Sequence, residues 1–83
     1  MNKGIKVKIF DLQKGLEIYD NVKFIRLTSE DYNLLIMEDY LSIVGEINGR
    51  VDIKGDHIDL SFDNISAYYM NSKNVFNLMI KEV

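Results

Sequence analysis

The stretch that decides the fold class is Asn48-Gly49-Arg50-Val51-Asp52-Ile53-Lys54-Gly55-Asp56-His57-Ile58-Asp59-Leu60-Ser61-Phe62. Every second residue of its two halves is apolar, and the residues between them are polar or charged. This alternation is typical of strands that bury one face and expose the other. Asn48 and Gly49 both tolerate the positive φ that a tight hairpin turn needs. The stretch therefore predicts strands at 50–54 and 57–62 and a hairpin turn at Asn48-Gly49.

The same period of two extends over nearly the whole chain. We predict about nine short strands separated by turn-forming residues, at 5–10, 16–20, 22–27, 34–37, 41–47, 50–54, 57–62, 65–70 and 75–81. Turns at this spacing favour a sandwich or barrel over βαβ units. We expect an all-β fold, a small β-sandwich of mostly antiparallel strands that forms a single domain over residues 1–83.

Two segments depart from simple alternation. Residues 22–27 carry adjacent apolar side chains, which predicts a bulge or a strand that serves both sheets. Residues 31–40 contain four consecutive apolar residues, a pattern that suits either a short helix or a fully buried strand. We prefer the strand.

Composition excludes several functional classes. The chain has a net charge of −3 and a pI near 5.0, which argues against non-specific binding to nucleic acid, because that binding depends on neutralising phosphates. It contains no cysteine, so a disulfide framework and thiol chemistry are excluded. No apolar run approaches a signal-peptide core or the ~20 residues of a membrane span. We expect a cytoplasmic protein that does not insert into a membrane.

Few residues suggest catalysis or metal binding. His57 is the single histidine, and alternation turns it outward beside a turn, where a solvated surface histidine is the simplest interpretation. The serines lack a nucleophile-elbow motif and the glycines are isolated rather than clustered into a phosphate-binding loop. We therefore expect no enzyme activity and no cofactor. One alternative stays open, a metal or small-ligand site formed by Asp52, Asp56, His57 and Asp59.

Tyrosines and lysines bear on association. Five tyrosines are present, and this residue is enriched in protein interfaces because it adds contact area at little entropic cost. It also favours strands for purely structural reasons. Lysines on the predicted terminal strands, Lys6, Lys8, Lys73 and Lys81, are typical of edges that resist pairing. A monomer is thus slightly favoured over a homodimer.

The segment from Val22 to Tyr40, Val-Lys-Phe-Ile-Arg-Leu-Thr-Ser-Glu-Asp-Tyr-Asn-Leu-Leu-Ile-Met-Glu-Asp-Tyr, resembles part of a known family. Its order of strand, turn and strand is similar to the N-terminal β-sandwich domain of the F-type ATP synthase epsilon subunit. The later strands and the opening hairpin follow the same order. The resemblance implies a non-catalytic sandwich that contacts other proteins.

Departures from that family limit what the resemblance implies. Glu38-Asp39-Tyr40 stands where the family has Pro-Gly-His, and Tyr32 and Leu35 stand where it has glycines. The helical hairpin that usually follows the sandwich is not present in these residues, so we do not carry over its regulatory role. By position in the resemblance, the residues expected to bind a partner are Tyr32, Asn33, Met37, Glu38, Asp39 and Tyr40.

Three functional hypotheses follow. The first is a non-catalytic module that binds a protein partner whose identity the sequence leaves open. The second is a genuine short epsilon subunit that docks on the gamma subunit and c-ring of a rotary ATPase. The third is the ligand-binding or metal-binding sandwich.

Overall fold

Six strands make up the fold of the computed structural model, which describes residues 4–81. They are β1 (Ile5–Asp11), β2 (Gly15–Ser29), β3 (Asn33–Met37), β4 (Ile43–Gly55), β5 (Asp59–Ser72) and β6 (Val75–Ile80). The expectation of an all-β fold is confirmed. The segment 31–40 is also a strand at its centre rather than a helix.

The strands pair in the order β1-β6-β5-β4-β2-β3, and β1 also pairs with β2. Five strands thus close into a barrel, and β3 is added along the outside of β2. Every pairing is antiparallel except that of β1 with β6, which is parallel. The observed architecture is a five-stranded barrel with one extra strand, and the predicted sandwich of nine strands is not confirmed.

Six strands replace the predicted nine because three expected turns lie inside continuous strands. Residues 16–20 and 22–27 belong to β2, residues 43–47 and 50–54 to β4, and residues 59–62 and 65–70 to β5, so the predicted strands 41–47 and 57–62 each begin two residues too early. Asn21 and Asn64 adopt positive φ near points where the pairing register shifts, and Gly49 lies at one such shift. These residues therefore form β-bulges that bend a strand instead of ending it. The hairpin turn predicted at Asn48-Gly49 was wrong.

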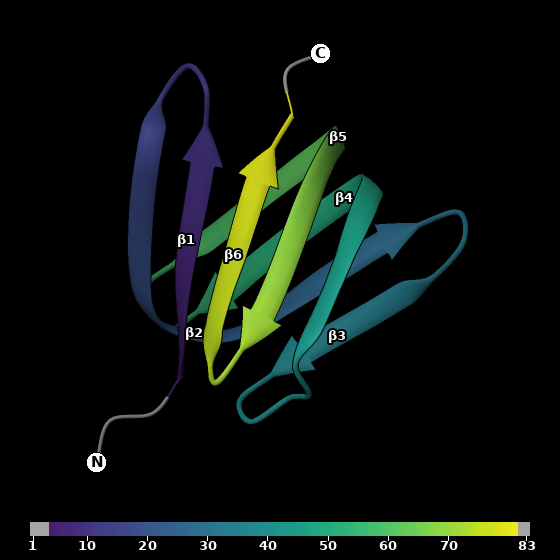
Figure 1. The fold of residues 1–83 in the computed structure, drawn as a ribbon. Helices are drawn as coiled ribbons and strands as arrows, with labels where there is room; N and C mark the ends of the chain where they lie inside the picture. The colour runs from purple at the N-terminus through teal and green to yellow at the C-terminus, as the bar shows by residue number, and fades with distance from the viewer. Residues whose placement is uncertain (1–3, 82–83) are drawn as a thin grey trace.

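Bending lets the long strands contribute to two layers (Figure 1). The figure shows β2, β4 and β5 curving along their length, so that each runs through both layers of the molecule. The first part of β2 pairs with β1, and its second part pairs with β3 and β4. The change occurs at a register shift between Val22 and Phe24, which confirms the predicted bulge in this segment.

The core follows from the alternation of side chains. Ile5, Val7 and Ile9 of β1 are buried, and their neighbours Lys6 and Phe10 are exposed. The same rule fills the interior from the other strands, with Val22, Ile25, Leu27, Ile36, Ile47, Val51, Ile53, Ala67, Tyr69, Phe76 and Leu78. The inward phase was thus correct for the predicted strands 5–10, 50–54 and 57–62, although the number of strands was not.

Gly45 leaves space for the side chain of Tyr69, which is buried in this core. A Cβ at Gly45 would lie 2.4 Å from the hydroxyl oxygen of Tyr69, its pairing partner on β5. Without that Cβ, the Tyr69 ring lies across the glycine and stacks on Phe76 with 6.0 Å between ring centroids.

Candidate protein-binding surface

One of the two layers carries many apolar side chains on its outer side. This layer consists of β1, β6, the second half of β5 and the first halves of β2 and β4. Pairing places these side chains in two rows that cross the strands. The first row contains Leu16, Phe10, Met79 and Tyr68, in spatial order. The second contains Ile18, Lys8, Asn77, Met70 and Val44. We call these nine residues the apolar face.

The apolar members of this face are well exposed. Phe10 is 42% accessible to solvent, Met79 is 53% and Val44 is 74%. Single exposed apolar residues are ordinary, whereas a contiguous set marks a site of interaction. The sequence does not predict this face, because alternation shows that a residue points outward but not which outward residues become neighbours.

A groove lies at one end of the apolar face. Its volume is about 230 Å³, and its lining is Phe10, Leu12, Tyr68, Met79, Ile80 and Lys81. The Lys81 ammonium lies 4.5 Å from the centroid of the Tyr68 ring and is paired with the Glu46 carboxylate. The hydrogen bond to Glu46 raises the pKa of Lys81. The groove is smaller than the ~300–1,000 Å³ of small-molecule sites and is of a size to take one apolar side chain.

The outer side of the other layer is polar. Arg50 donates hydrogen bonds to Asp52 at 3.0 Å and to Asp63 at 2.8 Å, and the Ser61 hydroxyl donates to Asp52 at 2.7 Å. Lys54 is paired with Asp59 on the adjacent strand. These five charged residues satisfy one another, so the two sides of the molecule differ in chemistry.

Asp52 links this network to stability. Its carboxylate is buried, and the hydrogen bond from Arg50 lowers its pKa below the ordinary value of 3.8. Because the folded pKa lies below the unfolded one, the pair contributes stability that is complete above the unfolded pKa and is lost as pH falls through the folded pKa. Loss of this contribution should begin below about pH 4.

We expect Asp52→Asn to lower the free energy of unfolding at pH 7 by roughly 1–3 kcal/mol, because Arg50 and Ser61 lose a charged acceptor. The difference from the wild type should shrink at pH 2–3. Urea unfolding at both pH values measures it. Asp59→Asn, which removes a solvent-exposed ion pair, is the matched control and should cost less than about 1 kcal/mol. Equal costs for the two substitutions at pH 7 would contradict this account.

The six residues expected from the resemblance lie on β3 and at its two ends. The Tyr32 hydroxyl donates to the Glu46 carbonyl oxygen at 2.6 Å and lies 3.3 Å from the Tyr69 hydroxyl. Burial raises the pKa of Tyr32, and the hydrogen bond with Tyr69 adds to this. Asn33 accepts a hydrogen bond from Arg26 at 3.3 Å. Tyr32 therefore fastens the start of β3 to β4.

The turn after β3 holds the remaining members. Met37 is 52% exposed, and Glu38 is half-buried. Asp39 adopts a φ of 65°, and its N–H donates to the Asn74 side chain at 2.6 Å. Tyr40 packs partly against the core. Tyr32 and Tyr40 thus contribute to the structure, and a role of the six residues in partner binding stays a prediction.

The structure does not bring the proposed metal ligands together. Asp52 is bound by Arg50, Asp56 is paired with Lys23 at 3.5 Å, and Asp59 is paired with Lys54. Within residues 4–81, no group of three or more histidine, aspartate or glutamate side chains could hold a metal ion.

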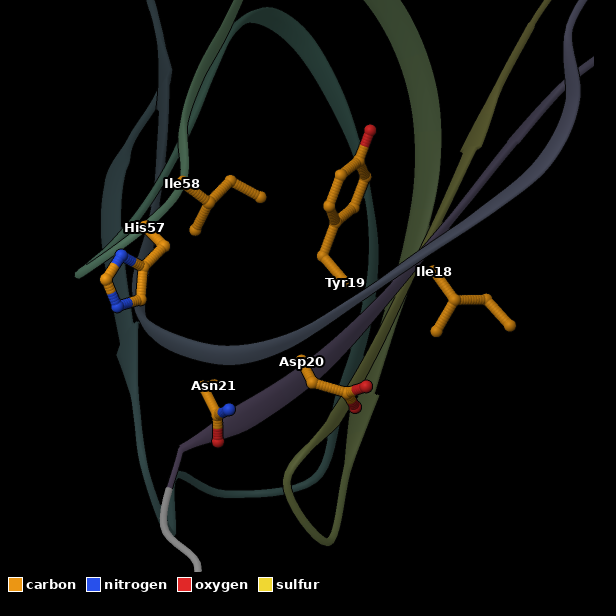
Figure 2. Close-up of a pocket in the computed structure, with 6 residues that line it drawn as sticks. All are labelled: Ile18, Tyr19, Asp20, Asn21, His57 and Ile58. Carbon is orange, nitrogen blue, oxygen red and sulfur yellow. The ribbon is translucent and has the colours of Figure 1, made fainter.

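His57 instead lines a separate open pocket of about 270 Å³ with Ile18, Tyr19, Asp20, Asn21 and Ile58. Figure 2 shows the His57 ring and the Asp20 carboxylate pointing in different directions, with no convergence on a common point. This arrangement lacks the orienting contact that a general base needs.

Comparisons with known proteins bear on the fold. No protein family matches the sequence, and no curated protein matches it either. Residues 4–81 contain no helix with the length and apolar character needed to cross a membrane.

A similar fold occurs in a chain of the cryo-EM structure of the Tetrahymena thermophila mitochondrial ATP synthase, central stalk and c-ring. The TM-score is 0.78 at 12% sequence identity, and the match covers 98% of this chain and 66% of that chain. At this identity the likeness shows the fold alone. It agrees with the coarser part of the sequence resemblance, a β domain of the kind found in a rotary ATP synthase, and the assignment to the epsilon subunit stays a prediction.

Proposed function

We propose that this chain is a non-catalytic protein-binding module that docks on its partner through the apolar face. The observation that carries the proposal is the exposure of Leu16, Phe10, Met79 and Tyr68 in one continuous row across four strands. Exposing such a row to water is unfavourable in free energy. Binding of a partner would bury these side chains and remove that unfavourable term. The central anchors of interfaces are commonly aromatic residues, and Phe10 and Tyr68 fit that role.

The fold supports a narrower form of the proposal. Because a chain of similar fold is part of an ATP synthase central stalk and c-ring assembly, we propose that the partner is a component of a rotary ATPase stalk. The epsilon-like assignment belongs to this narrower form. This chain spans 66% of the length of the similar chain, and the activity of the whole assembly is not transferred to it.

The charged residues support a binding role rather than a catalytic one. On the polar side, Arg50 is held by Asp52 and Asp63, and Lys54 is held by Asp59. A general acid or base needs a perturbed pKa and access to substrate. Asp52 has the lowered pKa of a structural ion pair, which is the opposite of the shift that a carboxylic acid catalyst requires.

Photocrosslinking in cells tests the proposal. A photoreactive amino acid at Met79, on the apolar face, should form a crosslink to a discrete protein, identified by mass spectrometry as a subunit of a rotary ATPase stalk. The same amino acid at Asp59, which is exposed on the polar side, is the matched control and should give no such product. Crosslinks from position 59 but not from position 79 would overturn the proposed surface.

A crosslink from position 79 to a protein outside any rotary ATPase would support the protein-binding module. It would reject the narrower proposal that the partner belongs to a rotary ATPase stalk. The segment Tyr32–Tyr40 remains a second proposed surface. A third photoreactive position at Met37, the most exposed apolar side chain of that segment, separates the two surfaces in the same experiment.

A further inference from the structure

We propose that the occupant of the apolar face is an amphipathic α-helix of the partner, with a carboxylate in its contact surface that meets Lys8 and Asn77. This inference rests on the proposed function and adds the chemistry of the bound element. It is carried by the shape of the face, by its charges and by its area.

The shape of the face matches a helix in length and width. Each row spans up to five neighbouring strands, a distance of about 19 Å at the ~4.8 Å spacing of paired strands. The two rows are two residues apart along each strand, or about 7 Å. A helix rises ~1.5 Å per residue and is ~10 Å across, so about 13 residues would cover the face with one apolar stripe. The groove at Phe10, Leu12 and Met79 lies over the central strands of the rows, so it would receive a single large side chain from near the middle of the helix.

The charges of the face specify the carboxylate. Lys8 lies between Ile18 and Asn77 in the second row, is half-buried, and forms no ion pair with another residue of the segment 4–81. The neighbouring lysines are already paired, Lys6 with Asp20 at 3.3 Å and Lys81 with Glu46. Covering Lys8 with a purely apolar surface would bury an unpaired charge, which is strongly unfavourable. A partner carboxylate would supply the missing charge, and the Asn77 amide is placed to donate a second hydrogen bond to it.

The same features argue against a second copy of this chain as the occupant. Two copies docked face to face would bring two Lys8 residues into one interface with no free carboxylate, because Asp20 and Glu46 are engaged. Five strand widths of ~4.8 Å and two row widths of ~7 Å give the face an area of roughly 340 Å², whereas a stable interface buries about 800 Å² from each partner. One helix fits this area, and a dimer needs more.

Synthetic peptides test the inference on the full chain. The first is a helical peptide of about 14 residues with a leucine stripe interrupted by one central glutamate. The second has lysine in place of that glutamate, and the third has the residues of the first in an order that spreads the leucines around the helix. Titrations followed by amide chemical shifts give affinity and location together. We expect the glutamate peptide to bind at least about tenfold more tightly than the other two, with the largest shifts at Lys8, Phe10, Asn77 and Met79.

A charge exchange makes the test specific. In the Lys8→Glu variant the preference should reverse, so that the lysine peptide binds more tightly than the glutamate peptide. Lys14→Glu, which changes the charge of an exposed turn residue outside the face, is the matched control and should keep the original preference. Equal affinity for the first two peptides, no reversal in Lys8→Glu, or no binding of any peptide up to about 1 mM would overturn the inference.

Two further arms separate other occupants. Tighter binding to phosphatidylglycerol vesicles than to the glutamate peptide, lost in Lys8→Glu, would replace the helix by an anionic membrane surface. Concentration-dependent dimers in analytical ultracentrifugation that disappear in Met79→Glu would replace it by a second copy. If the crosslink from position 79 to a protein persists while the peptide preference fails, the inference alone is rejected. If that crosslink is absent, the proposed function is rejected first.

Discussion

Replacing Phe10 and Met79 together by glutamate is expected to weaken partner binding by at least about 100-fold, since central anchors of an interface each contribute about 2 kcal/mol or more. Both side chains are exposed, at 42% and 53%, so glutamates at these positions stay hydrated in the free protein. The free energy of unfolding should therefore change little. In the complex, the two carboxylates would be trapped against apolar surface. Affinity is measured by calorimetric titration with the partner found by crosslinking, and stability by thermal unfolding.

Met37→Glu is the matched control for this double variant. Met37 is 52% exposed and receives the same chemical change, but it lies at the end of β3, away from the apolar face. We expect its affinity for the partner to stay within about threefold of the wild type. The reverse outcome, loss of binding in Met37→Glu and normal binding in the double variant, would move the docking site to the segment Tyr32–Tyr40. A melting temperature that falls steeply in the double variant would show that Phe10 and Met79 are structural instead.

The inward phase of the strands was predictable from sequence because it is a local property. In β1 and in residues 51–53 and 58–62, the apolar member of each alternating pair is the one that faces the interior. Alternation arises from the geometry of a single strand, so it needs no knowledge of the partner strands.

Strand ends were not predictable in the same way. Asn21, Gly49 and Asn64 have the turn-forming character that predicts a chain reversal, and all three adopt a positive φ. In the barrel the same conformation produces a bulge, because the chain continues to pair on both sides of it. Sequence reports the preferred dihedral angle of the residue, whereas pairing elsewhere in the chain decides between a bend and a turn.

The candidate surface was missed for a related reason. Phe10, Tyr68 and Met79 each had a visible signal, an apolar residue in the outward phase of a strand. They become a continuous row only through the parallel pairing of β1 with β6 and the antiparallel pairing of β5 with β6. The pairing of β1 with β6 joins residues nearly seventy positions apart in the sequence, such as Phe10 and Met79, and register between distant strands cannot be read from periodicity. The resemblance to the epsilon subunit predicted partner-binding residues in the segment 32–40 instead.

Gly49→Ala is expected to cost about 3 kcal/mol or more of folding free energy. Gly49 has a φ of 156°, and a Cβ there would lie 2.2 Å from the Thr28 carbonyl oxygen. That oxygen belongs to the backbone of β2, which pairs with β4 beside this position, so no side-chain rotation can relieve the contact. Relief requires β2 and β4 to separate at the bulge, with loss of the hydrogen bonds and core contacts that close the barrel there.

The expected loss is large against the total stability of so small a domain, which is on the order of 4–12 kcal/mol for 83 residues. A cost of about 3 kcal/mol should lower the melting temperature by roughly 12–24 °C, measured by circular dichroism. Gly15→Ala is the matched control, because Gly15 also has a positive φ, of 82°, but a Cβ there would meet nothing within 4 Å. It should lower the melting temperature by less than half as much, since only backbone strain of about 1 kcal/mol is added. Equal effects of the two substitutions would show that strain alone is responsible, and that the close approach of β2 to β4 does not determine where the barrel bends.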